Sequence, residues 1–183
     1  MYKRQVSIDD EKAGETIVDY LIEHGHTKIA EIGANLELSQ TARLRHNGYL
    51  NSLKKHGITP DERYYERARF SYDSAYRAMK KLLEKDIEIT AVYAISDVMA
   101  IGALRAILDK GLRVPEDISI TGFDGSTLAE YYNPKIVSIR QPHKDMAARS
   151  VELLFNMIDL HKGSCHEIIS FELTEGESVA RIN

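Results

Sequence analysis

Cysteine is nearly absent from this chain, because Cys165 is the only one among its 183 residues. A single cysteine excludes an internal disulfide framework and a zinc site built from several thiolates. The seven histidines do not cluster at the spacings that metal ligands require, so we expect no metal site. Scarce cysteine also fits the reducing cytoplasm.

An excess of positive charge is absent as well, and so are long apolar runs. Lys and Arg total 24 against 28 Asp and Glu, which gives a formal net charge of −4, so no basic excess indicates a nucleic-acid surface. No apolar run approaches the roughly 20 residues that span a membrane. The first five residues lack the apolar core of a signal peptide, which favours the cytoplasm if the chain starts at its native end.

Three common enzyme signatures are missing. The sequence has no Gly-x-x-x-x-Gly-Lys-Ser/Thr phosphate loop and no Gly-x-Gly-x-x-Gly dinucleotide turn. It also has no Gly-x-Ser-x-Gly nucleophile elbow. We therefore expect a protein that is not an enzyme and holds no cofactor. An enzyme of the doubly wound class stays open as an alternative, which turnover dependent on Asp124 would support.

Two hydrophobic periodicities alternate along the chain. Apolar residues spaced i, i+3 or i+4, i+7 predict amphipathic helices within 13–21, 42–53, 75–83, 100–108 and 147–158. Short apolar runs predict strands at 6–8, 28–32, 90–95, 118–121, 137–139 and 168–173. The alternation predicts an α/β fold, in which helices flank a Rossmann-like parallel sheet.

Several polar positions are given structural roles. Gly25, Gly57 and Gly111 stand where predicted helices end, since glycine accepts a positive φ there. Asp9-Asp10 precedes a helix and is better explained by capping than by catalysis, and His26 is interpreted as structural. Residues 59–66 are polar, contain a proline and are expected to form a surface loop.

Polar residues also follow the predicted strands, at the edge where ligands bind in open α/β sheets. Asp124 ends an apolar run in a Gly-Phe-Asp-Gly turn, and its carboxylate would accept hydrogen bonds from the hydroxyls of a sugar-like ligand. Ser96 and Asp97 stand where a strand meets the next helix, a place that equally favours an N-cap. Gln141 follows the strand at 137–139 and is uninformative by itself.

Arg45 and Phe70 each allow two interpretations. Arg45 lies near the start of a helix, and its position alone favours a solvated or ion-paired surface residue over a ligand donor. Phe70 ends the aromatic-rich segment 64–72, which favours packing in the core or at an interface. The alternative is that Phe70 forms an apolar plate for a sugar or a base.

In their order and spacing, these segments resemble the effector-binding region of LacI/GalR-type transcriptional repressors. The matching stretches are 6–10, 13–14, 20–26, 42–49, 96–102, 111–119 and 122–124. The resemblance implies a type I periplasmic-binding-protein-like fold, with two Rossmann-like lobes joined by three crossings and a ligand in the cleft between them.

The resemblance also implies which residues bind the ligand. The predicted set is Arg45, Phe70, Ser96, Asp97, Asp124 and Gln141. Arg45 would donate to ligand hydroxyls, Asp124 would accept from them and Phe70 would stack. Ser96 departs from the asparagine common in the family, and the loss of a bidentate amide could change the ligand preference.

The family's helix-turn-helix DNA reader and most of its first lobe lie before the point that matches the start of this chain. The resemblance therefore implies a partial structure: residues 10–135 form the second lobe, 136–160 form a crossing strand and a helix of the first lobe, and 161–183 form a C-terminal strand and tail. Strand edges and apolar helix faces would then be exposed and would tend to find another chain. A homodimer is expected.

We accordingly expect the ligand-sensing region of a cytoplasmic LacI-type repressor. It would bind a small effector of the sugar type and control operator DNA binding allosterically. A periplasmic-type sugar-binding transport protein, which shares the fold, is the alternative.

Overall fold

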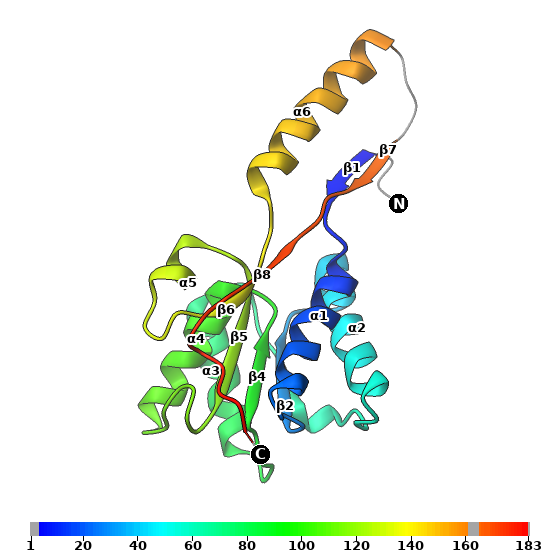
Figure 1. Ribbon diagram of the computed structural model, residues 1–183. Coiled ribbons are helices and arrows are strands. Elements are labelled where there is room, and N and C mark those ends of the chain that lie inside the picture. Colours follow the sequence, from blue (N-terminus) through cyan, green and yellow to red (C-terminus); the bar gives the residue numbers. More distant parts are fainter. Residues whose placement is uncertain (1–3, 161–164, 183) are drawn as a thin grey trace.

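The computed structural model describes residues 4–160 and 165–182, and its main body is a six-stranded sheet with the order β3-β2-β4-β5-β6-β8 (Figure 1). The parallel strands are β2 (Ile29–Gly33), β3 (Tyr65–Arg67), β4 (Ala91–Ala94), β5 (Ser119–Asp124) and β6 (Val137–Arg140). The last strand, β8 (Glu172–Thr174), runs antiparallel to β6. The predicted α/β fold with a parallel sheet is confirmed.

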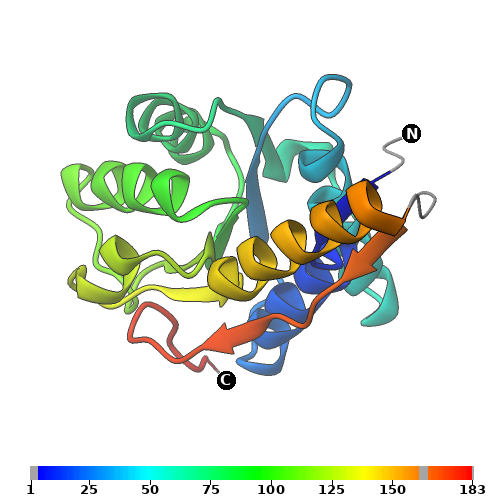
Figure 2. The same ribbon diagram turned by 90° about the horizontal axis from the view of Figure 1, so that it is seen from above.

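Helices cover both faces of this sheet (Figures 1 and 2). One face carries α1 (Asp10–Glu23) and α2 (Gln40–Lys55), and the other carries α3 (Tyr72–Glu84), α4 (Asp97–Asp109) and the short α5 (Thr127–Tyr131). All four residues of β4 are buried, as expected of a strand covered on both sides. The large side chains of this core include Tyr93, Phe123 and Ile32, each fully buried.

Local sequence explains where these helices begin and end. The N-cap side chains of Asp9, Ser39, Ser71, Ser96 and Ser126 each accept a hydrogen bond from a backbone N–H of the following turn. The chain leaves α1, α2 and α4 through glycines with φ of 97°, 71° and 82°, at positions 25, 57 and 111. The predicted capping by Asp9 and the predicted glycine helix ends are confirmed.

A smaller part projects from the main body (Figure 1). It contains α6 (His143–Leu160) and a two-stranded parallel sheet of β1 (Arg4–Ser7) with β7 (Cys165–Ile168). Four apolar residues of α6, Val151, Leu154, Phe155 and Ile158, are each more than half exposed. The segment 136–160 therefore belongs to two parts of the molecule. Its strand β6 pairs with β5 inside the main sheet, whereas α6 lies in the projecting part.

Two expectations about strands were wrong. Residues 59–66 are not all loop, since they hold a 3₁₀ turn, η1 (Glu62–Tyr64), and the start of β3. The strand is only three residues long, and it is held by the Tyr65 hydroxyl, which donates to the Ala34 carbonyl over 2.7 Å. The run 168–173 is not one strand, because β7 ends at Ile168 and pairs with β1, whereas β8 begins at Glu172 and pairs with β6.

Within the described residues, no helix has the length and apolar character that crossing a bilayer requires.

Candidate functional site

The candidate site lies where parallel strands end together. Because β4, β5 and β6 run in the same direction, their carboxyl ends bring Ser96, Asp124 and Gln141 to one edge of the sheet. Arg45 reaches this edge from α2, and its side chain is 6% exposed. The solvated surface position that sequence alone favoured for Arg45 is therefore wrong, because the helix directs this side chain inward.

Arg45 is held by contacts on several sides. Its Nε donates to Oδ1 of Asp10 over 2.8 Å, and its Nη1 donates to the Ile95 carbonyl over 2.7 Å. Nη1 also lies 3.6 Å from Oδ1 of Asp124. The guanidinium carbon lies 3.5 Å from the centroid of the Phe123 ring, a cation–π arrangement. Among the described residues nothing accepts from Nη2, so this atom keeps its donors for another partner.

Asp124 combines an unusual backbone with a crowded carboxylate. Its φ of 119° is rare for a residue other than glycine and costs about 1–3 kcal/mol. Oδ1 accepts from Nε2 of Gln141 over 2.8 Å, and the Gln141 backbone N–H donates to the Asp124 carbonyl. Burial raises the pKa of the Asp124 carboxyl, while the charge of Arg45 opposes that shift and Asp97 adds to it. Backbone strain at a partly buried acid is typical of functional sites.

Ser96 and Asp97 have defined structural partners. Ser96 is the N-cap of α4, and its hydroxyl accepts from the Met99 N–H over 3.3 Å. Asp97 is 1% exposed, and its two oxygens accept from the Ser126 N–H and the Ser138 hydroxyl, both over 2.6 Å. Burial raises the pKa of Asp97, and these hydrogen bonds oppose the shift. Asp97 thus joins three segments behind the edge, and its contact with a ligand stays a prediction.

Phe70 lies just beyond the carboxyl end of β3, at the same edge of the sheet, and is 51% exposed. Of the two kinds of packing that sequence alone favoured for Phe70, packing in the core is therefore wrong, and packing at an interface stays a prediction. Stacking of its ring on a ligand stays a prediction, as do the ligand contacts of Ser96 and Gln141.

Two members of the arrangement were not predicted from sequence, namely Asp10 and Phe123. Asp10 was assigned to capping, but Asp9 is the N-cap and Asp10 pairs with Arg45. Phe123 was noticed only as part of a turn, yet its ring lies under the guanidinium. By contrast, His26 is structural as predicted, since it bonds to the Thr90 hydroxyl and the Ala180 carbonyl.

A metal would need a cluster of ligating side chains. In the part of the chain that the structure describes, no group of three or more His, Cys, Asp or Glu is arranged to hold an ion. The chemistry available at this edge is hydrogen bonding from Arg45 and to Asp124, and the exposed ring of Phe70 lies at the same edge of the sheet. Such groups are suited to hydrogen bonding with a polar molecule.

A Rossmann-like lobe with polar residues at its carboxyl edge defines a ligand-binding domain. Residues 18–179 match the family described as a periplasmic binding protein-like domain, and the chain belongs to that family. Within it, the chain is 40% identical over 181 residues to the HTH-type transcriptional regulator MalR of Clostridium butyricum, covering 99% of this chain and 54% of that protein.

Solved structures agree with this assignment. A transcriptional regulator CelR–cellobiose complex has a TM-score of 0.91 at 34% identity, over 96% of this chain and 54% of that one. A LacI family transcriptional regulator from Enterococcus faecium with bound ribose has a TM-score of 0.90 at 26% identity, over 98% of this chain and 67% of that one. The resemblance to the effector-binding region of LacI-type regulators is confirmed. The chain spans about half the length of MalR.

Proposed function

We propose that this chain is the effector-sensing region of a LacI-type repressor, which binds operator DNA through a helix-turn-helix outside these residues. The observation that carries the proposal is the meeting of Arg45, Asp124 and Gln141 at one edge of the sheet. It is supported by the fold shared with regulators whose structures hold cellobiose and ribose. The regulator relatives favour this function over a sugar-binding transport protein.

The effector is a small polyhydroxylated molecule of the sugar type. Neighbouring hydroxyls of a sugar can both accept and donate, so they fit Nη2 of Arg45 beside the carboxylate of Asp124. Gln141 orients that carboxylate, and Phe70 offers an exposed ring for the apolar face of the sugar. Ser96 and Asp97 complete the predicted set at the start of α4. Binding and sensing such an effector require no covalent chemistry, so in this proposal the protein is not an enzyme and holds no cofactor.

Regulation follows from linkage between ligand and lobe geometry. A ligand shifts the equilibrium toward the arrangement that it binds better, by no more than its difference in affinity for the two arrangements. The exposed apolar stripe of α6 would pack on a first lobe that supplies the other wall of the cleft. Opening and closing of that cleft would then be transmitted to the DNA reader.

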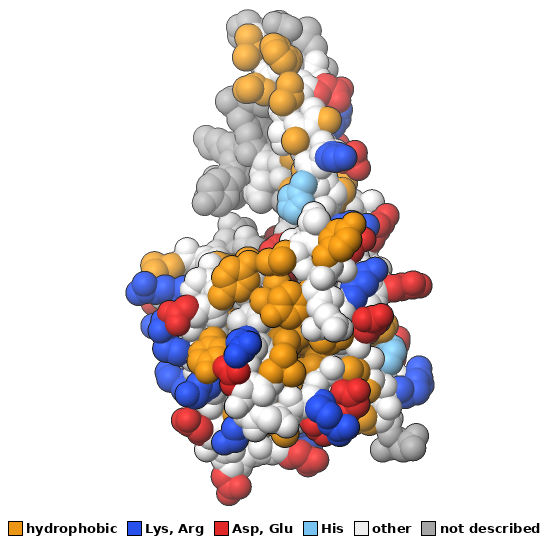
Figure 3. All heavy atoms as spheres, turned by 90° about the vertical axis from the view of Figure 1, so that its left-hand side faces the viewer, with side chains coloured by type: hydrophobic (Ala, Val, Ile, Leu, Met, Phe, Trp, Pro, Cys, Tyr) orange, Lys and Arg blue, Asp and Glu red, His pale blue; other side chains and the backbone are white. Residues whose placement is uncertain are grey.

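A homodimer is the assembly that we propose. The face formed by α3, α4 and α5 carries the exposed apolar residues Tyr72, Leu108, Leu128 and Tyr131, of which Tyr131 is 82% exposed. Figure 3 shows hydrophobic side chains gathered on this face. A patch of this kind on a soluble protein marks an interaction site. The protein would work in the cytoplasm, where its DNA target lies.

The test uses the complete protein that contains this chain. Cellobiose, ribose and a panel of other sugars and nucleosides are titrated by calorimetry, and any binder is added to the complex with an operator duplex selected from random DNA. A binder whose affinity depends on Arg45 and which changes operator affinity supports the proposal. An operator affinity unchanged at saturating ligand, or a ligand indifferent to Arg45→Gln, would overturn it.

A further inference from the structure

A second cavity lies on the α2 side of the sheet. Its volume is about 580 Å³, within the range of small-molecule pockets. Three residues spaced by four along α2 form one wall, namely His46, Leu50 and Lys54. The other walls come from Leu36, Pro60 and Tyr65. None of the residues proposed to bind the effector lines this cavity.

The cavity is also separate from the proposed dimer face. It lies over α2, whereas the exposed apolar patch belongs to α3, α4 and α5 on the opposite face of the sheet (Figures 1 and 2). Successive residues of a helix point about 100° apart, so Arg45 turns toward the effector edge while His46 turns toward the cavity. Dimerisation through that patch would leave the cavity open.

A buried acid sets the chemistry of the His46 ring. Nδ1 of His46 lies 2.6 Å from Oε2 of Glu31, which is fully buried. Burial raises the pKa of Glu31. Burial also disfavours protonated His46, but the hydrogen bond and charge of Glu31 outweigh that effect and raise the pKa of His46. The pair therefore keeps one shared proton to higher pH than an isolated histidine would.

The position of that shared proton does not change the group that the His46 ring presents to the cavity. If the proton is on Nδ1, the imidazolium carries a second hydrogen on Nε2. If it is on Glu31, Nδ1 is the acceptor and the neutral ring again carries its hydrogen on Nε2. Because Nδ1 faces Glu31, Nε2 on the far side of the ring presents a hydrogen-bond donor to the cavity.

The remaining walls favour an aromatic group and a negative charge. Leu36, Leu50 and Pro60 are apolar, and Tyr65 stands edge-on to His46 with ring centroids 5.2 Å apart. Lys54 adds a cation on the same helix stripe as His46. The carboxylate of Asp61 is occupied by Arg63, whose Nη2 lies 2.6 Å away, and the remaining acid, Glu62, is exposed.

We propose that this cavity is a second binding site, which takes a small aromatic carboxylate. The ring lies among the apolar side chains and Tyr65, and the carboxylate accepts from Nε2 of His46 beside the ammonium of Lys54. The site shares α2 with Arg45, but its existence does not depend on the effector function.

Three indole compounds test the ligand chemistry on the complete protein: indole-3-acetate, indole-3-acetamide and tryptamine. They share a ring system and differ in charge. We expect indole-3-acetate to bind with a dissociation constant on the order of 1 mM or lower, and at least about tenfold more tightly than tryptamine. Hydrogen exchange should slow in residues 46–54 and 60–65. Tryptamine binding as tightly as the acetate, or protection elsewhere only, would overturn the proposal.

Two variants distinguish binding in this cavity from nonspecific attraction of anions to the protein. Lys54→Met should weaken indole-3-acetate several-fold and leave indole-3-acetamide nearly unchanged. Leu50→Trp should fill the cavity and remove binding of both, and its folding is checked by thermal unfolding.

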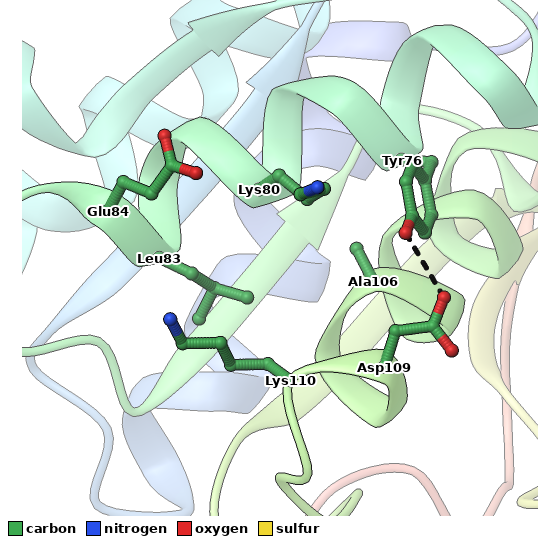
Figure 4. Close-up of a pocket in the computed structure, with 7 residues that line it drawn as sticks. All are labelled: Tyr76, Lys80, Leu83, Glu84, Ala106, Asp109 and Lys110. Atoms are coloured by element: carbon green, nitrogen blue, oxygen red, sulfur yellow. Dashed lines mark hydrogen bonds between the residues drawn. The ribbon is translucent and has the colours of Figure 1, made fainter.

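The matched control is Lys80→Met in a smaller hollow of about 310 Å³ between α3 and α4 (Figure 4). Lys80 and Lys110 line that hollow, where the Tyr76 hydroxyl donates to Asp109. Lys80→Met should leave indole-3-acetate binding unchanged. A loss of binding in Lys80→Met, or none in Lys54→Met, would contradict the assignment.

Discussion

Replacing Asp124 by asparagine is expected to change ligand affinity and folding stability in opposite directions. Asparagine keeps the size of the side chain and tolerates a positive φ better than most residues, which matters at a φ of 119°. Its amide oxygen can still accept from Nε2 of Gln141. The variant therefore removes little except the negative charge, which lies 3.6 Å from Arg45.

The two effects have different physical causes. A hydrogen bond to a charged group contributes about 1.5–3 kcal/mol, so losing the ionised acceptor should weaken effector binding by roughly 10- to 100-fold. In the free protein, burial raises the pKa of Asp124 even though Arg45 is close, which means that the surroundings disfavour the ionised form. Above that pKa the charge destabilises the fold, so a neutral amide should maintain or raise the melting temperature.

Calorimetric titration with the effector and thermal unfolding without it measure the two quantities at pH 7 on the complete protein. Asp97→Asn is the matched control, because Asp97 accepts from both Ser126 and Ser138 with its two oxygens, and an amide keeps only one of these acceptors. We expect that control to lose about 1–3 kcal/mol of folding stability. The reasoning fails if Asp124→Asn lowers the melting temperature while leaving the affinity unchanged.

Three further outcomes are expected. Gly122→Ala should lower the melting temperature markedly, because a Cβ there would collide with Oδ1 of Asp97; a normal melting curve would contradict this. Tyr131→Asp should weaken dimerisation at least about tenfold in sedimentation equilibrium, since a charge would enter the apolar patch; an unchanged dimer would remove that face from the interface. The pKa values of Glu31 and His46 are both raised, so their stabilising contribution is present at low pH and is lost as pH rises through the folded values. Glu31→Gln should therefore flatten the decline in stability from pH 6 toward alkaline pH, and an equally steep decline would refute the coupling.

Elements with a long, regular pattern could be predicted from sequence, and short ones could not. The stripe through Ala100, Ala103 and Leu104 predicts α4, and the apolar run at 91–94 predicts β4, because each pattern repeats over a whole buried surface. The three-residue β3 has no such repeat, since it exists through pairing with β2. The break between β7 and β8 was missed because the two strands join different sheets.

The residues of the candidate site were likewise predictable only in part. Asp124 and Gln141 follow strands whose parallel order could be inferred, so their meeting could be anticipated. Position on the helix alone favoured a solvated or ion-paired surface residue for Arg45, and only the resemblance to a family indicated a ligand contact. Asp10 and Phe123 had no signal in the sequence, because each contacts Arg45 from a segment distant in the chain.

The sequence by itself determined the alternation of strands and helices, the caps that bound them and the polar residues at strand ends, since these depend on neighbours within a few positions. Only the tertiary structure decided which of those polar residues meet. A guanidinium is held by Asp10, Ile95 and Asp124 because three segments converge on it, and the proton shared by His46 and Glu31 depends on a burial that no local pattern specifies.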